Sequence, residues 1–134
     1  MAPMAPNGVD VIVGVNRDAT FGPVVMFGLG GIFVEVLKDV TFRLAPFGET
    51  EARRMIEEIA GYALLDGVRG TARSDIDALA RVLAKISDFA AAHAADIESV
   101  DINPLRVLPK GQGVVALDAL LVPRRPSGTA EAPR

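Results

Sequence analysis

Two oxygen-bearing side chains near the end of the sequence, Asn103 and Asp118, could together bind a metal ion. Each lies in an apolar, strand-like run, and a glycine-containing turn at residues 110–113 joins the two runs. If the runs pair as a hairpin, the two side chains can project from one face at adjacent positions. Magnesium binds one or two protein oxygens together with substrate phosphates and waters, so this sparse pair suits it. The spacing suggests a cation site that holds phosphates.

A plainer interpretation of the same residues stays open. The Asn103-Pro104 step could be a strand irregularity, and Asp118 could be an acid at a strand end. Asp101 lies two positions before Asn103 and faces the same side if the strand is regular. The pattern alone therefore allows either a cation site or a structural role.

Residues 27–31 form a glycine cluster that resembles a phosphate-binding loop. No helix is expected directly after it, so neither the Rossmann fingerprint nor the P-loop applies. A tight turn or bulge explains Gly30 and Gly31 equally well. Glu35 is the single charge in an apolar run, and burying it unpaired would cost on the order of several kcal/mol. We expect Glu35 to face solvent, a cation or an active-site cleft.

Composition excludes several classes of protein. In a chain of 134 residues, 50% are hydrophobic and 23% are charged, which argues for a single folded domain. The net charge of −3 gives no reason to expect nucleic acid as a partner. The absence of cysteine excludes thiolate sites, and the presence of a single histidine, His93, argues against a local catalytic triad. The longest uncharged run, 19–34, is too short and glycine-rich to span a membrane, so we expect a cytoplasmic protein.

The periodicity predicts an α+β fold, a largely antiparallel sheet with two main helices on one face. Residues 1–8 are expected to be a disordered lead-in, 9–122 a single domain, and 123–134 a disordered tail. Ser74 is the expected N-cap of the second helix. The predicted strands are 9–15, 24–28, 32–37, 39–46 and the runs around Asp101 and Asp118, and the predicted helices are 49–60 and 74–92.

Several long motifs resemble one family, the ATP-grasp region of ADP-forming acyl-CoA synthetases of the acetate–CoA ligase type. These enzymes are related to the succinyl-CoA synthetase β subunit. The similarity extends from about Gly8 to Val122 and implies the C-terminal ATP-grasp subdomain. The motifs that carry it are residues 14–18, 21–40, 42–46, 101–105 and 117–119.

The resemblance implies formation of an acyl-CoA from a carboxylic acid, CoA and ATP, with release of ADP and phosphate. In the family this proceeds through an acyl phosphate and a phosphorylated histidine. Asn103 and Asp118 match the two positions that hold the Mg²⁺ of the nucleotide. Asp101 stands in Asp-Ile-Asn-Pro-Leu where the family has Glu-Ile-Asn-Pro-Leu, at the acid that meets the phosphohistidine; the charge is kept and the reach is shorter.

By the same resemblance, Gly30, Gly31 and Glu35 match the glycine-rich strand connection near the phosphate-transfer site. The first ATP-grasp subdomain, the CoA-binding domain and the catalytic histidine have no counterpart here, and no family motif surrounds His93. We expect these parts to come from another domain or subunit, and acyl selectivity to lie in them. A non-catalytic association or regulatory module, as in fusions with acyltransferase domains, is the alternative. The apolar run 24–36 predicts self-association.

Overall fold

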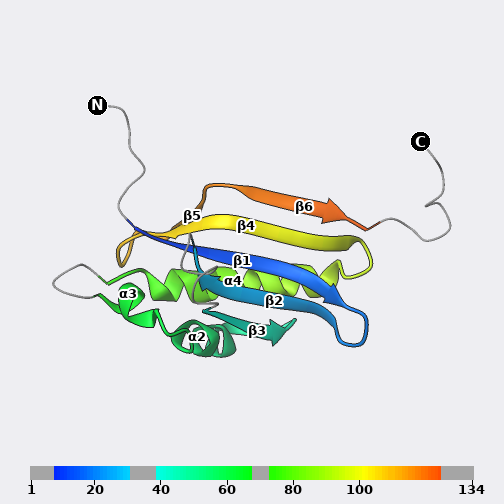
Figure 1. Cartoon of the computed structure of the whole chain (residues 1–134), viewed down its shortest axis with the longest axis horizontal. Helices are drawn as coiled ribbons and strands as arrows, with labels where there is room; N and C mark the ends of the chain where they lie inside the picture. Colours follow the sequence, from blue (N-terminus) through cyan, green and yellow to red (C-terminus); the bar gives the residue numbers. More distant parts are fainter. Residues whose placement is uncertain (1–7, 31–38, 68–72, 125–134) are drawn as a thin grey trace.

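The protein is an antiparallel sheet covered on one side by helices (Figure 1). The computed structural model describes residues 8–30, 39–67 and 73–124. The strand order is β3-β2-β1-β4-β5, and β6 also pairs with β4. This architecture confirms the predicted α+β fold. The elements are β1 (Val9–Asp18), β2 (Gly22–Leu29), β3 (Val40–Leu44), α2 (Glu49–Glu57), α3 (Tyr62–Asp66), α4 (Ile76–Ala92), β4 (Ile97–Val107), β5 (Val114–Ala116) and β6 (Ala119–Pro123).

The core forms where β1 and β2 pack against the helices. Alternate residues of β1 point to opposite faces of the sheet, and Val13 and Val15 point to the helix side, where both are buried. Their partners on β2, Phe27 and Val25, are also fully buried. Met55 of α2, Leu79 and Leu83 of α4 belong to the same buried cluster, as the expected helical spacing requires.

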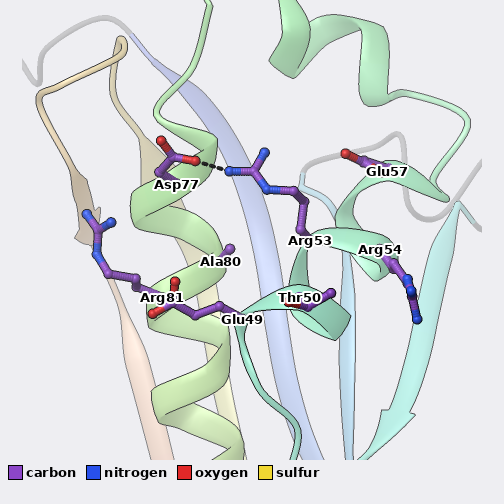
Figure 2. Close-up of a pocket in the computed structure, with 8 residues that line it drawn as sticks. All are labelled: Glu49, Thr50, Arg53, Arg54, Glu57, Asp77, Ala80 and Arg81. Atoms are coloured by element: carbon purple, nitrogen blue, oxygen red, sulfur yellow. Dashed lines mark hydrogen bonds and ion pairs between the residues drawn. The ribbon is translucent and has the colours of Figure 1, made fainter.

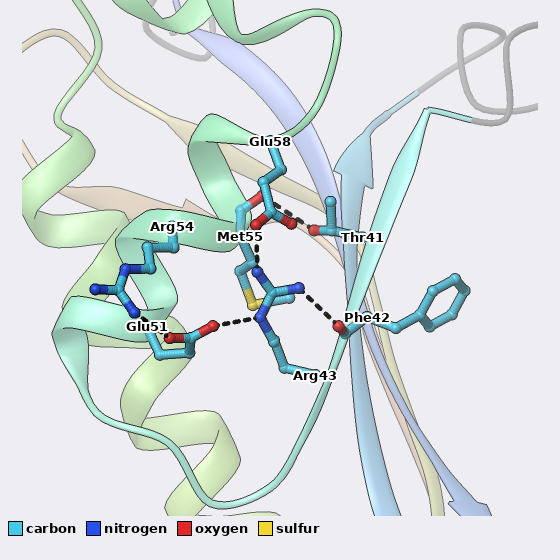
Figure 3. A network of polar contacts seen from close by, with 7 residues as sticks. All are labelled: Thr41, Phe42, Arg43, Glu51, Arg54, Met55 and Glu58. Carbon is cyan, nitrogen blue, oxygen red and sulfur yellow. Dashed lines mark hydrogen bonds and ion pairs between the residues drawn. The ribbon is translucent and has the colours of Figure 1, made fainter.

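Helix α2 is fastened to the edge strand β3 by a set of polar contacts (Figure 3). Arg43 of β3 donates hydrogen bonds of 2.6 Å to Glu51 and of 2.6 Å to Glu58. These two carboxylates, Glu58 more than Glu51, raise the pKa of Arg43 above its ordinary value. The Thr41 hydroxyl donates to the Met55 carbonyl oxygen at 3.0 Å. The contacts hold α2 over the edge of the sheet.

The N-cap of helix α4 lies one residue later than predicted. The N-cap is Asp75, not Ser74, because the Ser74 backbone is bound by other segments: its N–H donates to the Leu65 carbonyl, and Ser74 forms a β-bridge with Pro109. The Asp75 carboxylate instead accepts the Ala78 N–H at 3.1 Å. The predicted end of this helix near residue 92 is confirmed.

Asp75 also contacts the turn between β4 and β5. Its Oδ2 accepts the N–H groups of Gly111 at 3.1 Å and of Gly113 at 2.8 Å, and the residue is only 7% exposed. Burial by itself would raise the pKa of Asp75, but the N–H donors of Gly113, Ala78 and Gly111 outweigh burial and hold the pKa below its ordinary value. The ionised carboxylate is therefore part of the folded structure.

Three of the predicted segments cannot be compared in full with the structure. The predicted strand 32–37, together with Gly31 and Glu35, lies outside the described residues, as do most of the predicted lead-in and tail. The last described strand, β6, ends at Pro123, where the tail was predicted to begin. Within the described part of the chain, no helix is both long enough and apolar enough to cross a membrane.

The two phenylalanines of neighbouring strands should respond differently to truncation. Phe27 is 0% exposed and Phe42 is 56% exposed. Phe27→Ala should lower the free energy of unfolding by about 3–5 kcal/mol through lost burial and a residual cavity. Phe42→Ala, the matched control, should change it by about 0.5 kcal/mol or less. Urea denaturation measures both, and equal losses would contradict the assigned core.

The buried Asp75 carboxylate should make stability depend on pH. Because folding lowers its pKa, its contribution is present above the pKa of the unfolded chain, near 4, and is lost as pH falls through the folded pKa. Asp75→Asn should lower the free energy of unfolding by about 1–3 kcal/mol at pH 7. This difference from the unsubstituted protein should shrink below about pH 4 in urea denaturation. A difference that is constant from pH 7 to pH 3 would refute the assignment.

Candidate functional site

The predicted hairpin is present, and it brings Asn103 next to Asp118. Strand β4 pairs with β5 at one end and with β6 at the other, so the chain turns back along a single partner. Between these two ladders, the Asn103 N–H donates to the Asp118 carbonyl oxygen at 3.1 Å. The Leu117 N–H donates to the Pro104 carbonyl oxygen at 3.0 Å. Both candidate ligands are exposed at neighbouring cross-strand positions.

The strand carrying Asn103 is irregular, as the plainer interpretation allowed. On β1, Val13 pairs with Ile102 and Val11 pairs with Leu105, so β4 has one more residue than β1 in this interval. The simple alternation along β4 is therefore broken between Ile102 and Leu105. Such bulges redirect a side chain and are frequent beside active sites, so the irregularity is compatible with a binding role.

Asp101 lies on the sheet face opposite the helices, which we call the outer face. It pairs with Gly14, whose neighbours Val13 and Val15 point into the core, so Asp101 points the other way. Asp101 is exposed, and the glycine beside it presents no side chain. The register places one cross-strand row on this face: Phe42, Met26, Gly14, Asp101 and Leu120.

Gly30 makes a close backbone approach to β1. Its N–H donates to the Asp10 carbonyl oxygen at 2.9 Å, and a Cβ at this position would come within 3.2 Å of that oxygen. Close approach therefore accounts for the glycine, whether or not a phosphate binds nearby. Gly31 and Glu35, which completed the predicted phosphate-site group, fall outside the described residues.

The outer face also carries an ion pair that no sequence pattern predicted. Arg106 of β4 donates to both carboxylate oxygens of Asp10 on β1, at 2.7 and 3.1 Å. Hydrogen bonding to Asp10 raises the pKa of Arg106 above its ordinary value. Asp10 also accepts the Gly30 N–H through its carbonyl oxygen, so the residue that follows β2 lies beside β1 and β4 in the same row. No sequence signal marks this pair, because its members are far apart in the chain.

The chemistry of the donors fits a hard cation with few protein ligands. Among residues 8–30, 39–67 and 73–124, no three histidine, cysteine or acidic side chains come together as a metal-binding cluster. Asn103 and Asp118 offer an amide oxygen and a carboxylate oxygen from one exposed hairpin. That set matches Mg²⁺ completed by phosphate oxygens and waters better than a closed protein site.

A separate pocket of about 410 Å³ lies on the helix side, between α2 and α4 (Figure 2). Arg53 of α2 and Asp77 of α4 form an ion pair across it. Its walls carry both signs of charge and come only from the two helices, so it is not part of the Asn103–Asp118 site. The lining residues are Glu49, Thr50, Arg53, Arg54, Glu57, Asp77, Ala80 and Arg81.

The part of the predicted apolar run that the structure describes, residues 24–30, does not supply the main exposed apolar side chains. Within the described part of the run 24–36, Val25, Phe27 and Leu29 are buried in the core. Exposed apolar side chains are found instead on the outer face, at Phe42 of β3 and at Leu120 of β6, which is 62% exposed. The reason is that alternate residues of β2 point toward the helices.

Relatives in other organisms share this sequence at high identity. The acetate–CoA ligase [ADP-forming] II subunit beta of Pyrococcus furiosus is 48% identical over 122 residues, which are 91% of this chain and 52% of that protein. The 4-hydroxybutyrate–CoA ligase [ADP-forming] of Nitrosopumilus maritimus is 44% identical over 86% of this chain and 16% of its own length. The chain thus spans about half of the first of these relatives and a smaller share of the second.

Solved structures share the fold. PH1788 of Pyrococcus horikoshii superposes with a TM-score of 0.86 at 46% identity, over 93% of this chain and 52% of that one. The dinucleotide-forming acetyl-coenzyme A synthetase 1 of Ca. Korarchaeum cryptofilum, in complex with coenzyme A and Mg-AMPPCP, gives 0.83 at 43% identity, over 90% and 55%. The ATP-grasp domain family matches residues 1–122. The chain therefore belongs to the ATP-grasp family, with ADP-forming acid–CoA ligases among its relatives, as the motifs predicted.

Proposed function

We propose that this chain is the C-terminal ATP-grasp subdomain of an ADP-forming acyl-CoA synthetase and supplies the site for the phosphates of Mg-ATP. The observation that supports the proposal is the backbone hydrogen bond from the Asn103 N–H to the Asp118 carbonyl oxygen, which makes two magnesium-competent residues cross-strand neighbours in a chain related to such ligases. The Korarchaeum structure, which contains Mg-AMPPCP and coenzyme A, supports the same ligand classes.

In this proposal, Asn103 and Asp118 hold the magnesium of the nucleotide through their side-chain oxygens. When bound, Mg²⁺ neutralises the charge of the phosphates, which phosphoryl transfer requires more than covalent help from the protein. The residues are exposed, so a phosphate chain can approach them without any core rearrangement. Gly30, Gly31 and Glu35 contribute the glycine-rich connection beside the same phosphates.

Asp101 has a different task. Its carboxylate meets the phosphohistidine that another domain or subunit brings to the nucleotide, and it orients the imidazole ring. Its exposure on the outer face, next to the side-chain-free Gly14, leaves room for an incoming segment. In the Korarchaeum protein, a phosphohistidine segment points towards the nucleotide-binding site, which supports this role.

The remaining parts of the enzyme lie outside the family motifs of this chain. The first ATP-grasp subdomain would cover the nucleotide from the opposite side, and a further domain or subunit would carry CoA and the histidine. The relatives include a separate β subunit and longer proteins in which this region makes up 16% of the length, which supports such partners. The carboxylic acid substrate is then selected by those partners.

Magnesium-dependent nucleotide binding tests the proposal. Isothermal titration of Mg-ATP into the protein should give binding that EDTA abolishes, because the phosphates are held through the cation. The double variant Asn103→Ala/Asp118→Ala should lose the magnesium-dependent binding. Asp88→Ala, which removes an exposed acid from α4, is the matched control and should bind as the unsubstituted protein does. Equal heats in all three proteins, or no binding in any, would reject the nucleotide site and favour a non-catalytic module.

The uncovered outer face should cause self-association. Static light scattering at rising protein concentration should report species larger than a monomer, because exposed apolar side chains gain from burial. Phe42→Ser and Leu120→Ser should each reduce this association, whereas Leu64→Ser, at an exposed leucine on α3, should leave it unchanged. A monodisperse monomer at high concentration would contradict the expectation.

A further inference from the structure

One buried carboxylate joins the helix layer to the hairpin that carries the proposed magnesium ligands. We propose that Asp75 is a positioning residue that fixes the β4–β5 turn, and through it Asp118, relative to Asn103. Asp75 touches neither of these side chains in the structure, so its effect passes through the backbone. The expected effect on Mg-ATP binding rests on the proposed function. The positioning of the turn rests on the hydrogen bonds described below.

Both ends of the turn are tied to the segment in front of α4. Asp75 Oδ2 accepts the N–H groups of Gly111 and Gly113, and the Asp75 N–H donates to the Leu108 carbonyl oxygen at 2.8 Å. The Lys110 N–H donates to the Arg73 carbonyl oxygen at 2.8 Å. Gly111 and Gly113 have φ of 88° and 86°, a backbone conformation that other residues resist. The carboxylate therefore stabilises the one turn conformation in which both glycine N–H groups reach it.

Packing alone does not locate Asp118. Strand β5 has only three residues, and every residue of β6 is exposed. The hairpin arm that carries Asp118 is consequently positioned by backbone hydrogen bonds to β4 and by the turn at its start. Helix α4, in contrast, is anchored in the core through residues such as Leu79 and Leu83. Asp75 bonds both to this anchored helix and to the turn, and so fixes the hairpin relative to the helix, as supporting residues around a metal site commonly do.

Helix capping is the competing explanation, and the choice of substitution separates the two roles. Asparagine caps helices about as well as aspartate, so Asp75→Asn keeps an acceptor for the Ala78 N–H. Its NH₂ group, however, would face the two glycine N–H donors, and these lose their acceptor. Asp75→Ser likewise keeps a cap but is too short to reach both glycines, which makes it the second variant. Asp77→Asn, at the exposed acid two positions later, is the matched control.

Amide hydrogen exchange measured by NMR gives a readout that does not depend on ligand. Asp75→Asn and Asp75→Ser should speed exchange at Asn103 and Leu117, the two N–H groups that close the hairpin beside the metal pair, by about tenfold or more. Exchange in β1 and β2 should rise only as far as the loss of overall stability measured by urea denaturation requires, and the α4 amides near Ala78 should rise no further than these core amides. The two hairpin amides should accelerate by more than the core amides do. Mg-ATP affinity should fall by about tenfold, in line with other supporting residues of metal sites. Asp77→Asn should leave hairpin exchange and affinity unchanged.

Three outcomes would overturn the inference. Unchanged exchange at Asn103 and Leu117 in both Asp75 variants would leave Asp75 as a helix cap only. Faster hairpin exchange with unchanged Mg-ATP affinity would show that the turn does not position the ligands. If the unsubstituted protein fails to bind Mg-ATP, the proposed function fails, and the exchange of Asn103 and Leu117 still decides whether Asp75 holds the hairpin. Hairpin exchange that rises by no more than exchange in β1 and β2 would reflect the loss of overall stability alone and would also count against the inference.

Discussion

Burial of one face of an antiparallel sheet is the constraint on which the rest of this structure depends. The side chains of Val13, Phe27 and Leu79 meet in a layer from which water is excluded, and burial of such apolar area is the main favourable term in folding. Because residues alternate along each strand, the same pairing that fills this layer presents a second row to the outside. Asp101 belongs to that second row. Stability and the proposed chemistry thus occupy opposite faces of the same strands.

The proposed metal pair lies where packing gives least support, at an exposed hairpin on one side of the sheet. Hydrogen bonds therefore hold the pair in place. One joins the backbones of Asn103 and Asp118, and two join the turn glycines to Asp75. Exposed ion pairs contribute little on average, whereas a buried carboxylate that satisfies several backbone donors is costly to replace. For this reason the buried Asp75 contributes more to positioning the hairpin than the exposed ion pair of the pocket between α2 and α4 does.

Much of this could be predicted from the sequence, because it depends on local patterns. Strand alternation and helical spacing predicted the sheet, both main helices and the hairpin. The Asp-Ile-Asn-Pro-Leu motif and the later Asp118 identified the family, and the comparisons confirmed it. The magnesium and phosphohistidine roles of Asn103, Asp118 and Asp101 remain predictions, as do those of the glycine-rich segment.

Only the tertiary structure decided the contacts between distant segments. Ser74 has the sequence features of an N-cap, yet its N–H bonds to Leu65, it bridges to Pro109, and the cap is Asp75. Likewise, no spacing rule links Asp10 to Arg106, and only the β1–β4 register makes them partners. The physical reason is that periodicity reports which face a residue occupies within its own element. Which residue of a distant segment contacts that face depends on long-range packing, and no local pattern predicts it.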